Sequence, residues 1–549
     1  MATPGKRITL ITHVAALLLF SFVFFFNGIG SYSLKEPDEG RYGEIPREMV
    51  ETGDYVVPHL NYARYFEKPP LFYWTVALSY KIFGTDEWAL RFPNALSALL
   101  CVLGLYFFAG RWFGRQIAFI GAMILMSSMG FFAMAKIVTL DMFFTLWLFL
   151  SLMFFYGYYR ERKPLFIYLF YAAMGLATLT KGPVAIILLG LTIFAYLVIE
   201  RDISFLKEMK WVKGLILYLL VTLPWIVAIS LREKEFLSFF IVDQNFLRFL
   251  TSKHKRTGSV FYFFPVLFAG MLPWSFFIPR SFAALWAKKE LRLFFIWIIV
   301  VFAFFSVSKS KLPPYILPLF PVLSLVLACF FHEKWSEKSA IAETVACIAL
   351  FALFASSILL YRNAAFAAYI AAISGEASRF MRDLRGFTLG FSCLSLFVLV
   401  LLLRRVYNRL SFLFPLFIVF SSGVAIMLML NVDTIDRINT MKRFAHLIKA
   451  RSPAPERIVN YGAFDETLPF YLKGKVTIAN YTGELEMGSK YDDAKDIFMS
   501  ESEFAETFLS PERTVVLLKA KRLKWIGGIP GDKIKVIECS NERCLISNY

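Results

Sequence analysis

Residues 138–158 read VTLDMFFTLWLFLSLMFFYGY, an apolar stretch in which Asp141 is the one charged side chain. A helix needs about 20 apolar residues to cross a bilayer, so this stretch is long enough to span one. The rest of the chain is similar: 58% of its residues are apolar and only 18% are charged. Soluble domains are usually about 45–50% apolar and about 25% charged. The composition therefore excludes a single soluble globule and predicts an all-α polytopic membrane protein.

Apolar stretches of membrane-crossing length recur along residues 1–430 and predict about thirteen transmembrane helices. Their expected ranges are 10–27, 89–110, 116–133, 138–158, 165–180, 183–199, 214–231, 259–278, 291–307, 314–331, 340–361, 386–403 and 411–430. The apolar segment 71–84 is too short to cross and is expected to lie on the membrane surface as a juxtamembrane helix.

Every second loop between these spans is short and basic, as the positive-inside rule describes for cytoplasmic loops. This pattern places the N-terminus in the cytoplasm, and an odd number of spans then places the C-terminus outside. It also accounts for the net charge of +18, from 59 basic and 41 acidic residues. Nucleic-acid binding is not expected, because the chain has no basic run or RNA-binding motif.

Three segments outside the spans carry most of the remaining polar residues. Two are outer loops, 28–88 and 232–258, and the third is the tail 431–549. The tail alternates helix-like and strand-like patterns and predicts a small soluble α/β domain. The expected helices are 437–450 and 502–509, and the expected strands are 457–461, 513–518 and 533–539.

Cys539 and Cys544 stand near the C-terminus with four residues between them. They are either the two ends of a hairpin closed by a disulfide or two unpaired thiols on neighbouring strands. An exported compartment permits the bond, so we predict the disulfide.

Candidate chemistry lies mostly at the outer side of the membrane. In loop 28–88, carboxylates and cations alternate with aromatic residues beside Pro and Gly turns, which fits either a docked functional loop or a structural lid. Lys68 precedes a Pro-Pro turn, and Tyr315 lies at the outer mouth of another span; an ammonium and a phenol together can hold a lipid phosphate. Tyr315 is alternatively an interfacial belt residue, and Lys311 alternatively extends its ammonium to the membrane surface.

For Asp141 and for the segment 254–256, a functional role and a structural role are both open. Asp141 lies near the outer end of its span, where an acid is either functional or part of the helix start. His254, Lys255 and Arg256 either contact phosphates or belong to a solvated loop.

No Walker loop and no GxGxxG unit is present. An enzyme acting outside the membrane has no supply of nucleotide-sugar, so a glycosyl donor there needs a lipid carrier.

Several motifs together resemble the bacterial aminoarabinose lipid A transferase family. This family belongs to the polytopic GT-C glycosyltransferases, which include the protein O-mannosyltransferases as distant relatives. The matching stretches are Pro37-Asp38-Glu39-Gly40-Arg41-Tyr42, 47–60, Tyr65-Phe66-Glu67-Lys68-Pro69-Pro70, Asp141, Thr180-Lys181-Gly182-Pro183, 245–249 with His254, and Lys311-Leu312-Pro313-Pro314-Tyr315. They extend over nearly the whole chain.

The resemblance implies transfer of 4-amino-4-deoxy-L-arabinose from undecaprenyl phosphate to a lipid A phosphate at the periplasmic face of the bacterial inner membrane, which confers resistance to polymyxin. It implies a catalytic set of Asp38, Lys68, Asp141 and Tyr315. The substrate-binding set is Arg41, Tyr42, Tyr65, Glu67, His254, Arg256 and Lys311. Glu67 also matches a position that can contact a divalent metal such as zinc, and we expect a monomer.

Two other functions remain as alternatives. One is a different GT-C transferase, with a polyprenyl-phosphate sugar as donor and a protein or lipid hydroxyl as acceptor. The other is a lipid transporter, which typically has inverted repeats and charges at the bilayer midplane. The chain has no evident repeat and concentrates its polar motifs at the outer face, so the sequence favours a transferase.

Overall fold

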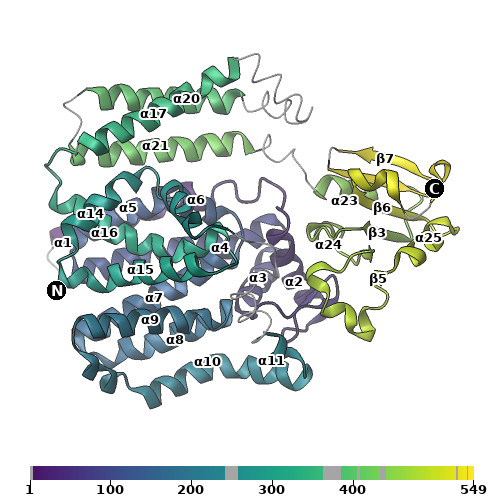
Figure 1. Ribbon diagram of the computed structural model, residues 1–549, viewed down its shortest axis with the longest axis horizontal. Coiled ribbons are helices and arrows are strands. Elements are labelled where there is room, and N and C mark those ends of the chain that lie inside the picture. The colour runs from purple at the N-terminus through teal and green to yellow at the C-terminus, as the bar shows by residue number, and fades with distance from the viewer. Residues whose placement is uncertain are drawn as a thin grey trace. The chain divides into compact units, whose positions relative to one another are not determined.

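The computed structural model describes residues 4–240, 258–339, 341–362, 385–404, 409–432, 441–526, 529–540 and 542–549. Its contacts divide the chain into two compact units (Figure 1). The first contains Met1–Ile29, Phe92–Arg362 and Arg385–Leu430, and the second contains Gly30–Arg91 and Asn431–Tyr549. Each unit is described by itself.

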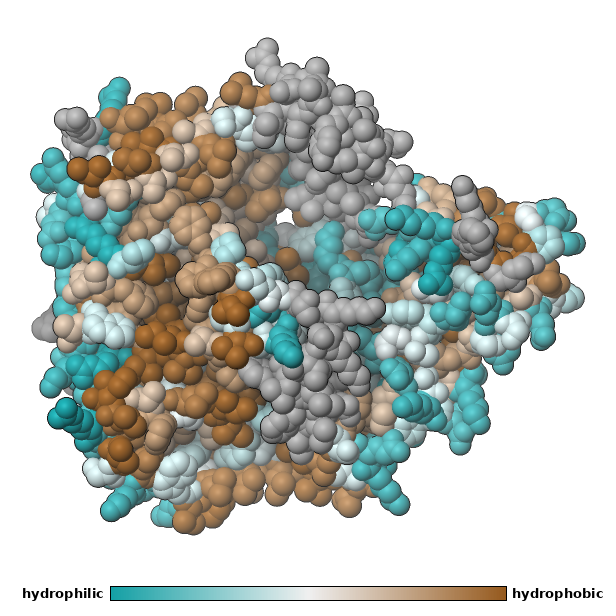
Figure 2. All heavy atoms as spheres, in the orientation of Figure 1, coloured by the Kyte–Doolittle hydropathy of each residue, from teal (hydrophilic) through white to brown (hydrophobic). Residues whose placement is uncertain are grey.

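The first unit is a bundle of apolar helices, of which α4 has its first residues, up to Arg91, in the second unit. Their bounds are α1 Pro4–Ser21, α4 Glu87–Trp112, α5 Arg115–Ser127, α6 Met129–Lys136, α7 Leu140–Glu161, α8 Pro164–Lys181, α9 Val184–Ile199, α10 Trp211–Arg232, α11 Phe236–Ser238, α13 Phe263–Gly270, α14 Ile278–Leu285, α15 Arg292–Val307, α16 Phe320–Glu333, α17 Ile341–Arg362, α20 Arg385–Leu403 and α21 Leu410–Leu430. Apolar side chains, brown in Figure 2, cover much of the visible surface of these helices. This surface is suited to contact with lipid.

In the described part of the chain, nine helices are long and apolar enough to cross a membrane, or eleven if two bent helix pairs each count as one span. The remaining two expected ranges, 183–199 and 340–361, coincide with shorter apolar stretches, Val184–Ile199 in α9 and Ile341–Ser357 in α17. Every expected range therefore falls on an apolar helix or a bent pair. The polytopic all-α architecture predicted from the sequence is confirmed.

Two of the expected spans are not continuous helices. The range 116–133 is divided into α5 and α6, which meet at 63°, and the range 259–278 falls on helices that meet at 114°. Ser128 has an extended backbone between α5 and α6. Pro273, between the helices of the second pair, has no amide hydrogen to continue a helical ladder. These interruptions were not predicted from hydropathy, because both segments are apolar throughout.

The second unit begins with two helices and a short hairpin from the first outer loop. They are α2 Asp38–Thr52, β1 His59–Leu60, β2 Ala63–Arg64 and α3 Leu71–Phe83. Helix α3 coincides with the predicted juxtamembrane helix.

The tail forms a six-stranded mixed sheet in the order β5-β4-β3-β6-β8-β7. The first four strands in this order are parallel to one another, and β8 is antiparallel to both β6 and β7. The strands are β3 Arg457–Tyr461, β4 Thr477–Ala479, β5 Phe498–Met499, β6 Thr514–Lys519, β7 Lys535–Cys539 and β8 Arg543–Ser547, and the helices are α23 Met441–Lys449, α24 Thr467–Leu472 and α25 Glu501–Leu509. The predicted α/β domain is confirmed, with β4, β5 and β8 as additional strands. A disulfide joins Cys539 to Cys544 across β7 and β8.

Alternate residues of β6 face two separate apolar cores. Val516 and Leu518 pack in the core that includes Phe504 of α25. Val515 and Leu517 pack in the core that includes residues of α23 and α24. This alternation is the period of two that a strand covered on both faces requires.

The first outer loop and the tail are joined by paired hydrogen bonds. The Asn61 side chain donates to the carbonyl of Val476 at 2.7 Å and accepts from its amide at 2.9 Å. The Glu36 carboxylate accepts from the amides of Glu466 and Thr467 at 3.0 and 2.8 Å. The sequence grouped loop 28–88 with the spans, whereas its contacts group it with the tail.

Candidate functional site

Arg41 lies at the centre of a polar cluster in the second unit. It belongs to α2, is only 4% exposed, and its Nη2 donates to Oδ1 of Asp38 at 2.8 Å. Its Nη1 donates to the Tyr65 hydroxyl at 3.1 Å and pairs with the carboxylate of Glu484 in the tail. Asp38 and Arg41 meet because residues three apart share one face of a helix.

The cluster also contains buried polar atoms without hydrogen-bond partners. Among the described residues, Nε of Arg41 and the hydroxyl of Tyr73 have none. The Tyr42 ring lies 6.0 Å from the Tyr73 ring and 5.9 Å from the Phe72 ring. Leaving a buried donor unsatisfied costs about 1–3 kcal/mol, so native proteins rarely keep such groups without a reason. A polar ligand that accepts from these donors would supply that reason.

The two phenols of this cluster act as neutral donors. Burial raises the pKa of Tyr65 and Tyr73 well above the ordinary value for tyrosine, and Arg41 only partly opposes the shift. Both hydroxyls therefore keep their protons at neutral pH. The Tyr65 hydroxyl already donates to Glu484 at 3.5 Å, so the Tyr73 hydroxyl and Nε of Arg41 are the described donors left for phosphate or sugar oxygens.

The adjacent Glu67 and Lys68 also belong to the second unit. Glu67 is buried, and Nζ of Lys68 donates to the carbonyl of Glu67 at 3.0 Å. Among the described residues, no three His, Cys, Asp or Glu side chains gather into a set suited to a metal ion. A metal at Glu67 therefore stays a prediction from the resemblance.

A second candidate cluster lies in the first unit. Asp141, in the first turn of α7, forms an ion pair with Lys181, the last residue of α8. Nζ of Lys181 also lies 4.5 Å from the centre of the Tyr315 ring. Asp141 and Tyr315, predicted from separate motifs, are thus brought together by Lys181.

Lys311 has its ammonium surrounded by backbone. Its Nζ donates to the carbonyls of Ser306 and Ser308 at 2.7 and 2.6 Å, so it caps the last turn of α15. It is also buried rather than extended to the surface. Its role in substrate binding stays a prediction. His254 and Arg256 lie outside the described residues.

Three residues of these clusters were missing from the predicted site. Glu484 is 443 positions from Arg41, so no local pattern connects them. Tyr73 lies in the first turn of α3, shortly after the Tyr-Phe-Glu-Lys block, and the aromatic residues beside it in the sequence were the available signal. Lys181 stands in the matched Thr-Lys-Gly-Pro motif; it was considered as a lining residue of the cavity but was not included in the predicted site, because a tight turn already explains the Gly and the Pro.

Two family models match separate parts of the chain. Residues 67–227 match the dolichyl-phosphate-mannose-protein mannosyltransferase family. Residues 444–547 match the aminoarabinose transferase C-terminal domain. The first match includes Glu67, Lys68, Asp141 and Lys181, and the second includes Glu484.

Curated relatives carry one name, undecaprenyl phosphate-alpha-4-amino-4-deoxy-L-arabinose arabinosyl transferase. The protein from Yersinia enterocolitica is 34% identical over 58% of this chain and 58% of its own length. The protein from Shewanella sediminis is 28% identical over 91% of this chain and 92% of its own. The match thus spans less than two thirds of the Yersinia relative and nearly all of the Shewanella relative.

Solved structures extend the likeness to the full chain. The crystal structure of ArnT from Cupriavidus metallidurans bound to undecaprenyl phosphate has a TM-score of 0.84 at 27% identity, covering 100% of this chain and 99% of that one. Over its full length the chain is thus similar to the aminoarabinose transferases. The apo ArnT structure gives a TM-score of 0.81 at 26% identity, over 99% and 98% of the two chains. This likeness, together with the apolar helices described above, makes the chain a multi-pass membrane protein.

Proposed function

We propose that this chain transfers 4-amino-4-deoxy-L-arabinose from undecaprenyl phosphate to a phosphate of lipid A at the periplasmic face of the bacterial inner membrane. The observation that carries the proposal is the full-length likeness to ArnT bound to undecaprenyl phosphate. The match of the tail to the aminoarabinose transferase C-terminal domain supports the choice of sugar.

The leaving group of this reaction is a lipid phosphate. Negative charge builds on its oxygen as the bond to the sugar breaks, and positioned cations and hydroxyls stabilise that charge. Lys68 and Tyr315 are the residues proposed for this role. Arg41, Tyr42 and Tyr65 bind sugar or phosphate oxygens, and the unsatisfied Nε of Arg41 supports a ligand at this cluster.

The acceptor is a phosphate oxygen that is already anionic at neutral pH. Such a nucleophile needs less help from a general base than a hydroxyl does. Asp38, held by Arg41, therefore orients the acceptor or the sugar amine, and can also act as base. A single displacement with inversion is proposed by analogy with other GT-C enzymes.

Asp141 and Lys181 form an ion pair beside Tyr315. The Lys181 ammonium over the Tyr315 ring stabilises this orientation of the phenol. No proposed step passes through a metal ion.

Capping the phosphate with an amino sugar reduces the negative charge of lipid A. Cationic peptides such as polymyxin then bind it less tightly, because much of their attraction to the membrane is electrostatic. Resistance to these peptides is the cellular outcome of the proposed reaction.

The match of residues 67–227 to protein mannosyltransferases favours one alternative, sugar transfer to a protein hydroxyl. Purified chain in liposomes, supplied with undecaprenyl phosphate-aminoarabinose, should modify lipid A and leave a Ser/Thr peptide unmodified. Lys68→Ala and Asp38→Ala should each abolish transfer, whereas Lys81→Ala, at an exposed lysine of α3, should retain it. Modification of the peptide alone, or full activity of either site variant, would contradict the proposal.

A further inference from the structure

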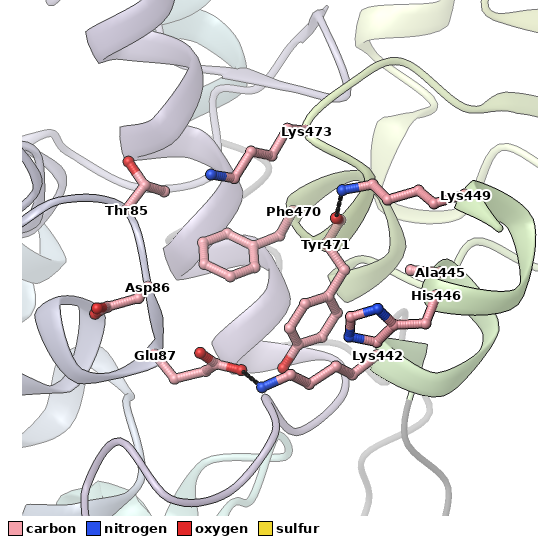
Figure 3. A pocket seen from close by; sticks show the side chains of 10 residues that line it. All are labelled: Thr85, Asp86, Glu87, Lys442, Ala445, His446, Lys449, Phe470, Tyr471 and Lys473. Atoms are coloured by element: carbon pink, nitrogen blue, oxygen red, sulfur yellow. Dashed lines mark hydrogen bonds and ion pairs between the residues drawn. The ribbon is translucent and has the colours of Figure 1, made fainter.

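A cavity of about 180 Å³ lies in the second unit, apart from the Arg41 cluster. One wall is the turn between α3 and α4, and the others come from α23, α24 and the residue that ends α24 (Figure 3). The lining residues are Thr85, Asp86, Glu87, Lys442, Ala445, His446, Lys449, Phe470, Tyr471 and Lys473. None of these residues belongs to the predicted site.

The cavity has more cations than carboxylates. Three lysines and one histidine line it, against Asp86 and Glu87. Glu87 is paired with Lys442 at 2.6 Å, and Oδ1 of Asp86 accepts the amide of Ala89 in the first turn of α4 at 2.7 Å. Both acids are therefore already engaged.

Lys449, Lys473 and His446 are the other basic side chains of the cavity, and they can still donate hydrogen bonds to a ligand. Nζ of Lys449 donates to the carbonyl of Tyr471 at 2.8 Å, which leaves two of its three hydrogens. Within the described ranges, neither Lys449, Lys473 nor His446 is paired with a carboxylate. Lys473 extends from the α24 side of the cavity toward Thr85 (Figure 3). This arrangement favours an anion.

The sequence places this cavity at the level of the membrane surface. Helix α4 begins at Glu87, which lines the cavity, and is 26 residues long and apolar enough to cross a membrane. A span starts where the hydrocarbon core meets the headgroup layer. Trp88, whose ring contacts that of Phe83 at 5.0 Å, is of the residue type that gathers at this boundary.

An exposed apolar face leads to the cavity. Leu78, Ile82 and Phe83, in the last turns of α3, are 58%, 62% and 47% exposed. Leu78 and Ile82 are four residues apart and so lie on one face of the helix. The chain passes from this face to Thr85 in the cavity wall within two residues. A cationic cavity joined to an apolar face has the two parts that a charged lipid needs.

We infer that this cavity binds the phosphate of an anionic membrane lipid, whose acyl chains lie along the exposed face of α3. Lys473 and Lys449 contact the phosphate through charge-assisted hydrogen bonds, and His446 adds a hydrogen-bond donor. The inference concerns lipid binding alone and does not depend on the sugar-transfer reaction.

Native mass spectrometry of the full chain in neutral detergent, with added phosphatidylglycerol, tests this inference. We expect Lys449→Gln/Lys473→Gln to weaken phosphatidylglycerol binding about fivefold or more, because two charge-assisted contacts are lost. The control Lys519→Gln/Lys535→Gln removes the same charge from two exposed lysines outside the cavity and should stay within about twofold of the unsubstituted chain. Lys473→Arg should retain binding.

Three results would overturn the inference. The first is equal phosphatidylglycerol binding by the cavity variant and the control. The second is equal binding of phosphatidylglycerol and phosphatidylcholine by the unsubstituted chain. The third is displacement of the lipid by inorganic phosphate at similar concentration, which would assign the cavity to a free anion. Leu78→Ser/Ile82→Ser should weaken the binding of phosphatidylglycerol and leave the binding of inorganic phosphate unchanged.

Discussion

Two buried arginines of the second unit, Arg41 and Arg91, differ in how completely they are satisfied. Arg91 is 0% exposed and donates twice to Glu39, at 2.8 and 2.7 Å. It also donates to the carbonyls of Tyr32 and Ser33 at 2.8 and 3.0 Å. Arg41, by contrast, retains a buried Nε without a partner among the described residues.

The difference separates a structural arginine from a functional one. Every nitrogen of Arg91 is engaged by protein, so its network fixes the start of α4 against the first outer loop. Arg41 is positioned by Asp38, Tyr65 and Glu484, yet keeps a donor for something else. Burial and charge are alike in the two residues, so hydrogen-bond saturation is the property that distinguishes them.

The largest expected effect is on catalysis at Arg41. Arg41→Lys keeps the charge but loses Nε and the planar fork, so we expect the transfer rate to fall about 100-fold or more. The apparent Tm should change by only a few degrees. Rate and thermal unfolding measured on the same purified variant check this. Wild-type transfer by Arg41→Lys would remove the distinction between the two arginines.

The next effect is on stability at Arg91. Arg91→Gln leaves the buried carboxylate of Glu39 without its guanidinium, which costs about 3–5 kcal/mol in comparable buried pairs. Denaturant unfolding should report this loss. Arg64→Gln is the matched control, because Arg64 is partly exposed and its pair with Asp493 should contribute about 0–1 kcal/mol. Equal stability of the two variants would contradict the structural role of Arg91.

A smaller effect is expected at Glu484, which contacts Arg41 from the tail. Glu484→Gln leaves Asp38 as the remaining carboxylate on that guanidinium, so transfer should fall about tenfold. Glu484→Asp should recover part of the rate, because the charge is restored. Rates that match wild type in both variants would show that the tail does not position Arg41.

The smallest effect concerns pH and the Glu36–Glu466 pair. Burial, and then the charge of Glu36, raise the pKa of Glu466, and burial raises the pKa of Glu36. The folded state therefore holds a proton that the unfolded chain releases near pH 4.3. Stability from this pair is full below that pH and declines as pH rises through the folded pKa.

Glu466→Gln keeps a donor to Glu36 and removes the titrating group. The apparent Tm of the unsubstituted chain should decrease from pH 5 to pH 8. In Glu466→Gln that decrease should be smaller by about 2–4 °C. Thermal unfolding at both pH values, with Glu506→Gln as an unburied control, measures the difference. Parallel pH profiles of Glu466→Gln and the unsubstituted chain would contradict a shared proton at this contact.

The membrane architecture was predictable because hydrophobic length is a local property of the sequence. Residues 138–158 and twelve similar ranges each fall on apolar helices or bent pairs. Of the three partners of Arg41, two were in the predicted site: Asp38 and Tyr65 share its loop, whereas Glu484 reaches it through a tertiary contact across 443 positions. Strands β4 and β5 were missed because they contain only three and two residues.

The most direct test of the proposed function is mass spectrometry of lipid A from a transferase-deficient bacterial strain that expresses this chain. The account predicts a mass gain of one amino-pentose with the unsubstituted chain and no gain with Asp38→Ala at equal membrane abundance. Unmodified lipid A in cells that make both the folded chain and undecaprenyl phosphate-aminoarabinose would contradict it.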